Sequence, residues 1–259
     1  MRKALKHLMW SGLIWGIFMT AGFFFLFSGQ IRKTALTMEG EEIRWGKESN
    51  REKIAYLTFD DGPSNHTNRL LDLLKEEEVR ATFFVVGKEG EEAEEIYKRI
   101  VREGHGLGLH SYSHVYSDIY SSEEKFEKDL WKLKTYLYHV TGVSSDIYRF
   151  PGGSGNSSAR ISKENCVAFL REKNMEYYDW NASAEDAICV GTAPDVLMKR
   201  VLKDALKYDK TIILMHDLNS CETTLNMVRP LILRLKKEGY SFEILTKETE
   251  PIGRQFSGD

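Results

Sequence analysis

The sequence predicts an α/β fold, a distorted (β/α) barrel of about seven parallel strands preceded by one N-terminal transmembrane helix. After residue 50, short apolar, β-branched or aromatic runs alternate with charged segments of helical periodicity. Such alternation is typical of a parallel sheet covered by helices. About seven units in roughly 200 residues suit a small or distorted barrel better than an open sheet. The second observation is a long uncharged stretch near the N-terminus.

That stretch predicts a membrane anchor. Residues 8–30 carry no charged side chain, and about 20 apolar residues are enough to cross a bilayer. Its end lacks the small-residue pattern of a cleavage site, so an uncleaved anchor is favoured over a signal peptide. Arg2, Lys3 and Lys6 precede it, which predicts a cytoplasmic N-terminus and an extracytoplasmic remainder, in a single-pass protein of the cell membrane.

The chain therefore divides into five expected parts. They are a cytoplasmic N-terminus (1–7), a transmembrane signal-anchor helix (8–29), a tether (30–50), the barrel domain (51–249) and a C-terminal tail (250–259).

The barrel strands are expected where short runs rich in β-branched and aromatic residues end in turn or polar residues. In chain order they are Ile54–Phe59, Thr82–Val86, Gly106–His110, Ile147–Phe150, Met175–Trp180, Thr211–Met215 and Phe242–Leu245.

The helices are expected between these strands, because apolar residues there recur at helical spacing, as in Leu70, Leu71 and Leu74. Gly104 and Gly239 stand where helix C-caps belong. The expected helices lie near 66–78, 90–103, 122–140, 158–173, 194–207 and 222–238.

Composition excludes some classes of function. The formal net charge is -3, and the basic residues of the first 33 positions leave the acidic excess to the remainder of the chain. A nucleic-acid binder would instead show a basic face. Three scattered cysteines are too few for a disulfide framework or a CxxC zinc site, and we expect three ordinary thiols.

The most informative motif is Thr58–Ser64, where Asp60 and Asp61 end an apolar strand and a Gly-Pro turn follows. Neighbouring side chains on an extended segment point to opposite sides. We therefore expect one carboxylate to bind a metal and the other to stay free as a base. Two like charges this close also favour a nearby cation.

A second motif supplies the other metal ligands. His110 and His114 are four residues apart, so one turn of helix would put both imidazoles on one face. With Asp61 they make a ligand set that leaves one position open for water, as in catalytic zinc sites. Co²⁺, Ni²⁺ and Mn²⁺ also accept such ligands. A helix-surface histidine pair is the alternative interpretation.

Two further motifs lie at strand ends. Arg149 precedes a Gly-rich loop that lacks the Gly-Lys-Ser/Thr of a phosphate loop, and its rigid fork suits the carboxylate of Asp60. The small residues of the loop let backbone N–H groups approach a substrate closely. His216 follows the apolar run 212–215, where a buried structural histidine is the alternative.

Together, these motifs resemble a known family. Thr58–Ser64, His110–His114, Arg149–Gly153 and Leu214–His216 are similar, in the same order, to four signature motifs of the polysaccharide deacetylases (NodB-homology domain, carbohydrate esterase family four). The resemblance covers about 54 to 246. It implies a distorted (β/α) barrel and an enzyme that uses a divalent metal, commonly zinc, to remove N- or O-acetyl groups from polysaccharides.

The resemblance also implies a role for each matching residue. Asp60 is the general base, Arg149 keeps it ionised and aimed, and His216 is the general acid that protonates the leaving amine. The backbone N–H of Gly152 is a donor to the oxyanion. The implied metal ligands are Asp61, His110 and His114, and the implied substrate-binding residues are Gly152, Pro151, Leu214 and Trp180.

One family motif is imperfect here. Members often read W-x-x-D-x-x-D-W, whereas this chain keeps Trp180 and Asp186 but has Ser183 and Ala187 at the other two positions. Asp186 is the first choice as partner of His216, because a carboxylate would favour the protonated imidazole. Asp179 is the second candidate for this partner. If it does not pair with His216, we expect it to be a solvated carboxylate at the end of a strand.

Family and location together predict the removal of N-acetyl groups from a cell-surface polysaccharide, with N-acetylglucosamine of peptidoglycan as first choice. The alternatives are a chitin-oligomer deacetylase and an O-acetyl (xylan) esterase, or, in a different class, a non-catalytic glycan-binding domain. A zinc peptidase is disfavoured because H-E-x-x-H is absent. The expected partners are the acetylated polysaccharide and the membrane, with no nucleic acid and no evident protein partner.

Overall fold

The computed structural model describes residues 52–156 and 160–253. The predicted cytoplasmic N-terminus, the transmembrane helix (8–29) and the tether (30–50) lie outside these residues. Within the two described ranges, no helix is both long and apolar enough to cross a membrane.

The core of the fold is a parallel sheet, which confirms the α/β class and the distorted barrel. Seven strands follow the order β5-β4-β3-β2-β1-β7-β6, and β8 pairs with the start of β1 outside that path. The strands are β1 (Lys53–Asp60), β2 (Thr82–Val86), β3 (Gly106–Ser111), β4 (Ile147–Tyr148), β5 (Glu176–Tyr177), β6 (Ala182–Ser183), β7 (Lys210–His216) and β8 (Tyr240–Phe242).

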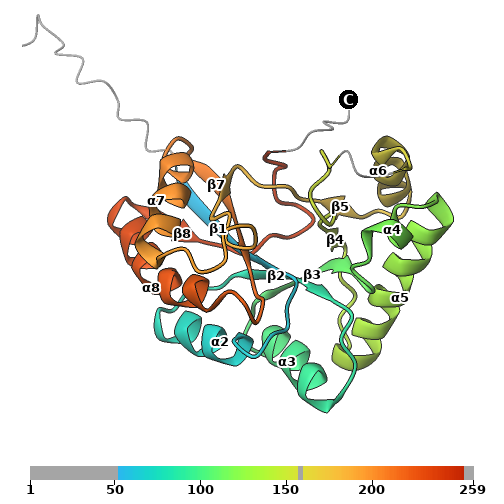
Figure 1. The fold of residues 1–259 in the computed structure, drawn as a ribbon, viewed down its shortest axis with the longest axis horizontal. Helices are drawn as coiled ribbons and strands as arrows, with labels where there is room; N and C mark the ends of the chain where they lie inside the picture. The colour runs from blue at the N-terminus through green and yellow to red at the C-terminus, as the bar shows by residue number, and fades with distance from the viewer. Residues whose placement is uncertain (1–51, 157–159, 254–259) are drawn as a thin grey trace, which may run out of the picture. The chain divides into compact units, whose positions relative to one another are not determined.

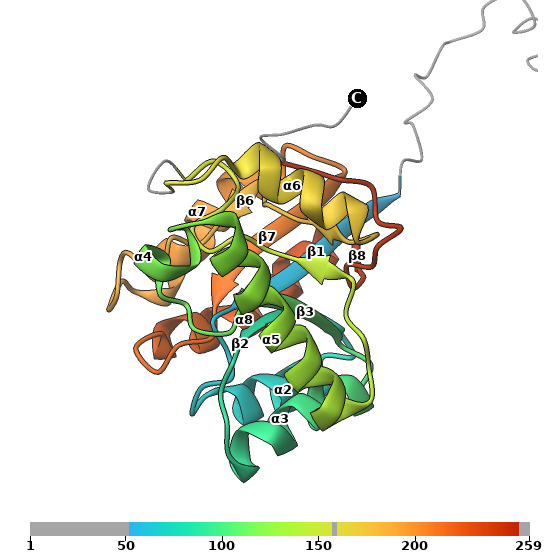
Figure 2. The same ribbon diagram turned by 90° about the vertical axis from the view of Figure 1, so that its right-hand side faces the viewer.

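Helices surround this sheet, as Figure 1 shows, with α2 and α3 on one side, α7 and α8 on another and α5 and α6 on a third. Helix α5 packs beside β3, and Figure 2 shows α5 in front of this strand. The described helices are α2 (Thr67–Glu76), α3 (Glu91–Arg102), α4 (Tyr116–Ile119), α5 (Glu123–Thr141), α6 (Lys163–Glu172), α7 (Pro194–Ala205) and α8 (Glu222–Lys237).

Strand β1 lies at the centre because it is apolar on both faces. All its residues after Lys53 are buried, as expected for a parallel strand covered on both sides. Leu57 and Phe59 belong to the main core, with residues of α2, α5 and α8. Ile54 and Tyr56 point to the other face and pack in a smaller cluster.

The register of the sheet places several ionisable side chains at one edge. Asp60, the last residue of β1, is the register partner of Phe84 in β2 and of His216 in β7. His110 lies one residue before the end of β3. The carboxyl ends of parallel strands form the face on which active sites of such folds are built.

Two predicted strands are shorter than expected, because the regular ladder stops where the chain turns. Strand β4 ends at Tyr148, and the loop that follows contains Pro151 and two glycines with positive φ. Strand β5 ends at Tyr177, although the N–H of Tyr178 still donates to the carbonyl of Tyr148 at 2.9 Å.

Other boundaries also differ. The last strand was predicted at 242–245 but lies at 240–242, and the N–H of Leu245 donates to the side chain of Thr82 instead of to a neighbouring strand. The helix predicted to begin at 158 begins at Lys163, after the cap residue Ser162. Strand β6 and helix α4 were not predicted, because two and four residues are too short to show a period. The prediction of three free thiols is confirmed.

Candidate active site

A buried arginine holds the first carboxylate of the motif at the end of β1. Arg149 is 0% exposed, and its Nη1 donates to Asp60 Oδ1 at 2.9 Å and to Thr58 Oγ1 at 2.6 Å. Its Nε and Nη2 donate to the carbonyls of Tyr178 at 2.9 Å and Asp179 at 3.2 Å. Because each of these nitrogens has an acceptor, the guanidinium group of Arg149 has a fixed orientation, and so has the carboxylate of Asp60 that it binds.

The second carboxylate meets the two histidines. Asp61 Oδ1 lies 3.1 Å from His114 Nε2 and 3.4 Å from His110 Nε2, and one ligand atom from each residue lies within 4.8 Å of the others. This oxygen is buried and has no hydrogen-bond partner among the described residues. A buried, unsatisfied carboxylate oxygen beside two imidazole nitrogens fits a divalent cation.

The protonation of the imidazoles supports the same interpretation. His110 Nδ1 lies 2.7 Å from the carbonyl oxygen of Arg149, which can only accept, so Nδ1 carries a proton and Nε2 is the nitrogen available to a metal in the neutral ring. Burial lowers the pKa of His114, which favours its neutral ring. Both histidines can therefore act as metal ligands.

The route by which these ligands meet differs from the prediction. His110 and His114 do not share a helical turn: His110 lies in β3, and His114 follows in a turn with φ of 53°. The expectation that Asp60 and Asp61 point to opposite sides is also wrong, because His110 Nε2 lies 4.0 Å from Asp60 Oδ2 and 3.4 Å from Asp61 Oδ1. The extended alternation ends at Asp60, and Asp61 adopts φ of 73°.

The Gly-rich loop after Arg149 presents a free donor. The backbone N–H of Gly152 has no hydrogen-bond partner within residues 52–156 and 160–253. A Cβ on Gly152, whose φ is 75°, would lie 2.3 Å from Asn156 Nδ2 and 3.2 Å from the ring of Tyr116. A side chain here would be strained, since the backbone is left-handed and closely surrounded, and glycine avoids this strain.

Neighbouring side chains hold this loop. The hydroxyl of Tyr120 donates to the carbonyl of Pro151 at 2.9 Å. Asp179 accepts the N–H of Ser154 at 2.9 Å and also its hydroxyl. Asp179 is thus neither the partner of His216 nor a solvated carboxylate, the two interpretations that the sequence left open.

Asp186 takes the position beside His216. Its Oδ1 lies 2.8 Å from His216 Nδ1, and its Oδ2 accepts the backbone N–H of His216 at 2.9 Å and the hydroxyl of Thr224 at 2.7 Å. Burial alone would lower the pKa of His216, but the hydrogen bond and charge of Asp186 outweigh it, and the pKa is raised. The geometry therefore favours a protonated imidazole.

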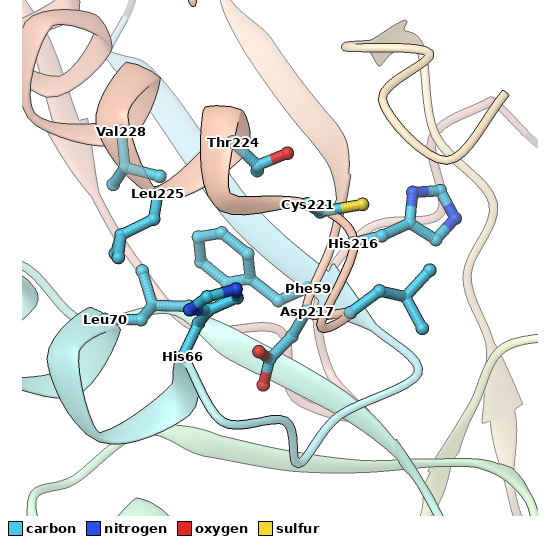
Figure 3. A pocket seen from close by; sticks show the side chains of 10 residues that line it. Phe59, His66, Leu70, His216, Asp217, Cys221, Thr224, Leu225 and Val228 are labelled. Carbon is cyan, nitrogen blue, oxygen red and sulfur yellow. The ribbon is translucent and has the colours of Figure 1, made fainter. Parts of the chain in front are cut away.

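A small cavity lies behind this pair. Figure 3 shows His216 at one side of it and the apolar side chains of Leu70, Leu225 and Val228 at the other. Its volume is about 10 Å³, room for about one water molecule.

The remaining predicted residues lie around the same edge. Leu214 is buried in β7, where it is the register partner of Thr58. Trp180 is partly exposed and lies against the loop, with its Cη2 atom 3.0 Å from where a Cβ of Gly153 would be.

Two acidic residues were not predicted as part of the site. Asp217 accepts the hydroxyls of Ser64 and Thr67, both at 2.5 Å, and thereby holds the turn after Asp61. Asp129, in α5, accepts three hydrogen bonds from the segment between the two histidines. The position of Asp217 directly after His216 was a usable signal, whereas nothing in the sequence pairs Asp129 with that segment.

Comparison with known proteins agrees with this arrangement. The family model described as polysaccharide deacetylase matches residues 47–167. A putative polysaccharide deacetylase of Bacillus subtilis, YheN, is 34% identical over 209 residues, which are 80% of this chain and 72% of that protein. A peptidoglycan-N-acetylglucosamine deacetylase of Bacillus cereus is 31% identical over 201 residues, which are 76% of this chain and 71% of that protein.

The fold is shared with a solved structure. The catalytic domain of peptidoglycan N-acetylglucosamine deacetylase from Eubacterium rectale superposes with a TM-score of 0.74 at 32% sequence identity, and the match covers 80% of this chain and 94% of that domain.

Proposed function

The chain belongs to the polysaccharide deacetylase family, and from this premise we propose that it removes N-acetyl groups from the N-acetylglucosamine of peptidoglycan. The observation that carries the proposal is the convergence of Asp61, His110 and His114 beside the buried Asp60. The peptidoglycan substrate is supported by the B. cereus and E. rectale proteins, whose names state that activity.

Asp61, His110 and His114 would hold the divalent cation. Zn²⁺ is the first choice, and Co²⁺, Ni²⁺ and Mn²⁺ suit the same ligands. When bound, such a cation acts as a Lewis acid that polarises a carbonyl and lowers the pKa of water.

The chain's own residues then divide the proton transfers. Asp60, held by Arg149 at 2.9 Å, accepts the proton of the water that attacks the acetamide carbon. The N–H of Gly152 donates to the oxygen on which negative charge develops. His216, kept protonated by Asp186, gives a proton to the leaving amine as the carbon–nitrogen bond breaks. The products are acetate and a free amino sugar.

The proposed location is the outer face of the cell membrane. The uncharged residues 8–29, with basic residues before them, suit an anchor whose N-terminus is cytoplasmic. A tether of residues 30–50 would keep the enzyme close to the membrane and to the wall outside it.

Acetate release by the full-length chain, purified in mild detergent, tests the activity. Peptidoglycan, N-acetylglucosamine oligomers and O-acetylated xylan are compared, each with added Zn²⁺ and with a chelator. We expect metal-dependent release, fastest from peptidoglycan. Release from xylan alone would favour the esterase, and release from the oligomers alone the chitin-type enzyme.

Asp60→Asn separates chemistry from binding in the same assay. We expect kcat to fall about 10²–10⁴-fold, because the general base is lost, while metal is still bound. Asp195→Asn, an exposed position of α7 paired with Lys199, is the matched control and should leave the rate unchanged. No release from any substrate by the wild-type chain with metal bound would favour the non-catalytic glycan-binding domain.

A further inference from the structure

The segment that carries His114 has an unusual backbone. After β3 ends at Ser111, the chain turns, and His114 adopts φ of 53°. A residue with a side chain is strained in this left-handed region and keeps that conformation only where its surroundings fix it. Some group must therefore hold this turn.

The group is the carboxylate of Asp129, which reaches the turn from α5. Its Oδ2 accepts the hydroxyl of Ser111 at 2.7 Å and the N–H of Tyr112 at 2.8 Å, and its Oδ1 accepts the N–H of Ser113 at 2.9 Å. Three donors from three consecutive residues thus meet one side chain. Hydrogen bonds to an ionised acceptor are roughly twice as strong as neutral ones.

The chain of bonds continues to the metal ligand itself. The Oγ of Ser111, which donates to Asp129, accepts the backbone N–H of His114 at 2.9 Å. The carboxylate therefore acts on His114 through one hydroxyl and through the backbone of the turn. It contacts neither the imidazole nor Asp61 in any hydrogen bond among the described residues.

We propose that Asp129 is a positioning residue for the metal site: through Ser111 and the backbone of residues 111–113 it holds His114 where its Nε2 can bind a cation together with Asp61. The proposal rests on the metal site of the proposed function and assigns a residue outside that ligand set. Groups behind metal ligands typically change affinity or activity about 10–100-fold when they are removed.

Co²⁺ binding by the full-length chain tests this without relying on activity. The dissociation constant is measured by competition with a chromophoric chelator, and the visible absorption of bound Co²⁺ reports the geometry of its ligands. For Asp129→Asn we expect affinity to fall about 10–100-fold, with an altered absorption band. The control is Asp118→Asn, which makes the same charge change in α4, at a side chain that is 53% exposed and paired with Lys125.

Ser111→Ala removes the link nearest to His114 and should also weaken Co²⁺ binding. If both residues act along one path, the double variant loses less binding free energy than the two single variants added together, since coupled positions are not additive. Thermal unfolding of the metal-free proteins shows that each variant is folded. If Asp129→Asn is not folded, Ser111→Ala decides alone.

Each outcome has one meaning. The positioning role is supported if Asp129→Asn binds Co²⁺ more weakly and has an altered absorption band, while the control Asp118→Asn shows neither change. Wild-type affinity in Asp129→Asn, or in Ser111→Ala, overturns it and leaves the proposed function standing. A wild-type chain that binds no Co²⁺ would overturn both this inference and the metal site of the proposed function.

Discussion

Arg149 and Asp60 form a buried ion pair at the centre of the sheet, with Nη1 2.9 Å from Oδ1 and side chains that are 0% and 4% exposed. The guanidinium also lies against the ring of Phe84, 4.2 Å from its centroid. The same contacts that fix the carboxylate of Asp60 therefore also satisfy a charge that is fully removed from water. Under the proposed function, stability and reactivity would depend on the same pair.

Arg149→Lys should lower the free energy of unfolding by about 3–5 kcal/mol, because an ammonium cannot reach the acceptors of the fork and a buried carboxylate loses its partner. Urea unfolding measures this loss. Arg234→Lys is the matched control: that arginine pairs with Glu238 on the exposed face of α8, and we expect a change within about 0.5 kcal/mol. Equal losses in the two variants would show that the buried pair contributes nothing special.

Asp186→Asn should change the pH profile of the reaction. Asp186 raises the pKa of His216, so its neutralisation lowers that pKa and fewer imidazoles are protonated at neutral pH. The alkaline limb of kcat/KM against pH should therefore move to lower pH. Initial rates from about pH 5 to 10 measure it.

An unmoved alkaline limb in Asp186→Asn would mean that His216 is not the group whose proton the reaction needs. Asp195→Asn again serves as the surface control, because this side chain of α7 is 62% exposed and pairs with Lys199.

Gly152→Ala should reduce kcat because a Cβ at this position collides with Asn156 and moves the oxyanion donor. We expect a fall of about 10²–10³-fold, the usual effect of losing one such donor. Gly142→Ala is the matched control, since Gly142 has a similar φ of 74° but a Cβ there would meet nothing within 4 Å. Both variants should melt at a lower temperature, and only Gly152→Ala should be slow; a comparable fall of kcat in both would contradict the proposed role.

His105 should make the protein less stable in mild acid. Burial lowers its pKa to about 4 from the usual value of 6.5 for histidine, and its Nδ1 accepts the N–H of Ala81. The unfolded chain therefore binds a proton between about pH 6.5 and 4 that the folded chain does not. The contribution of His105 to the free energy of unfolding is complete above about pH 6.5 and is lost as the pH falls toward 4. The loss amounts to at most about 3 kcal/mol.

Urea unfolding at several pH values measures how steeply the free energy of unfolding changes with pH. His105→Asn should make this dependence flatter, because asparagine can accept the same hydrogen bond without titrating. A slope as steep as that of the wild type would assign the acid sensitivity to other groups.

The sequence predicted the residues that meet better than the path by which they meet. Because Asp60 and His216 are each the last residue of a strand, parallel pairing alone was enough to bring them to one edge. The helical geometry expected for His110 and His114 was wrong, since spacing of four cannot distinguish a helix from a strand followed by a turn.

What the sequence could not show were contacts between distant segments. Asp129 is 15 residues from His114 in the chain, and only the packing of α5 beside β3 brings it to the turn. Asp179 reached Ser154 in the same way. Periodicity reports which face of an element is buried, but not which loop a polar side chain on that element meets.

The register of β1 and β7 sets the backbone distance between the proposed acid, His216, and the proposed base, Asp60. Asp60 and His216 are opposite residues on adjacent strands, so their separation follows from the spacing of a hydrogen-bonded sheet and is shielded from changes in the loops. The sheet does not fix the whole site, since His114 lies in the turn after β3 and Gly152 in the loop after β4. Substitutions in other loops that preserve the register of β1 and β7 should therefore leave Asp60 opposite His216.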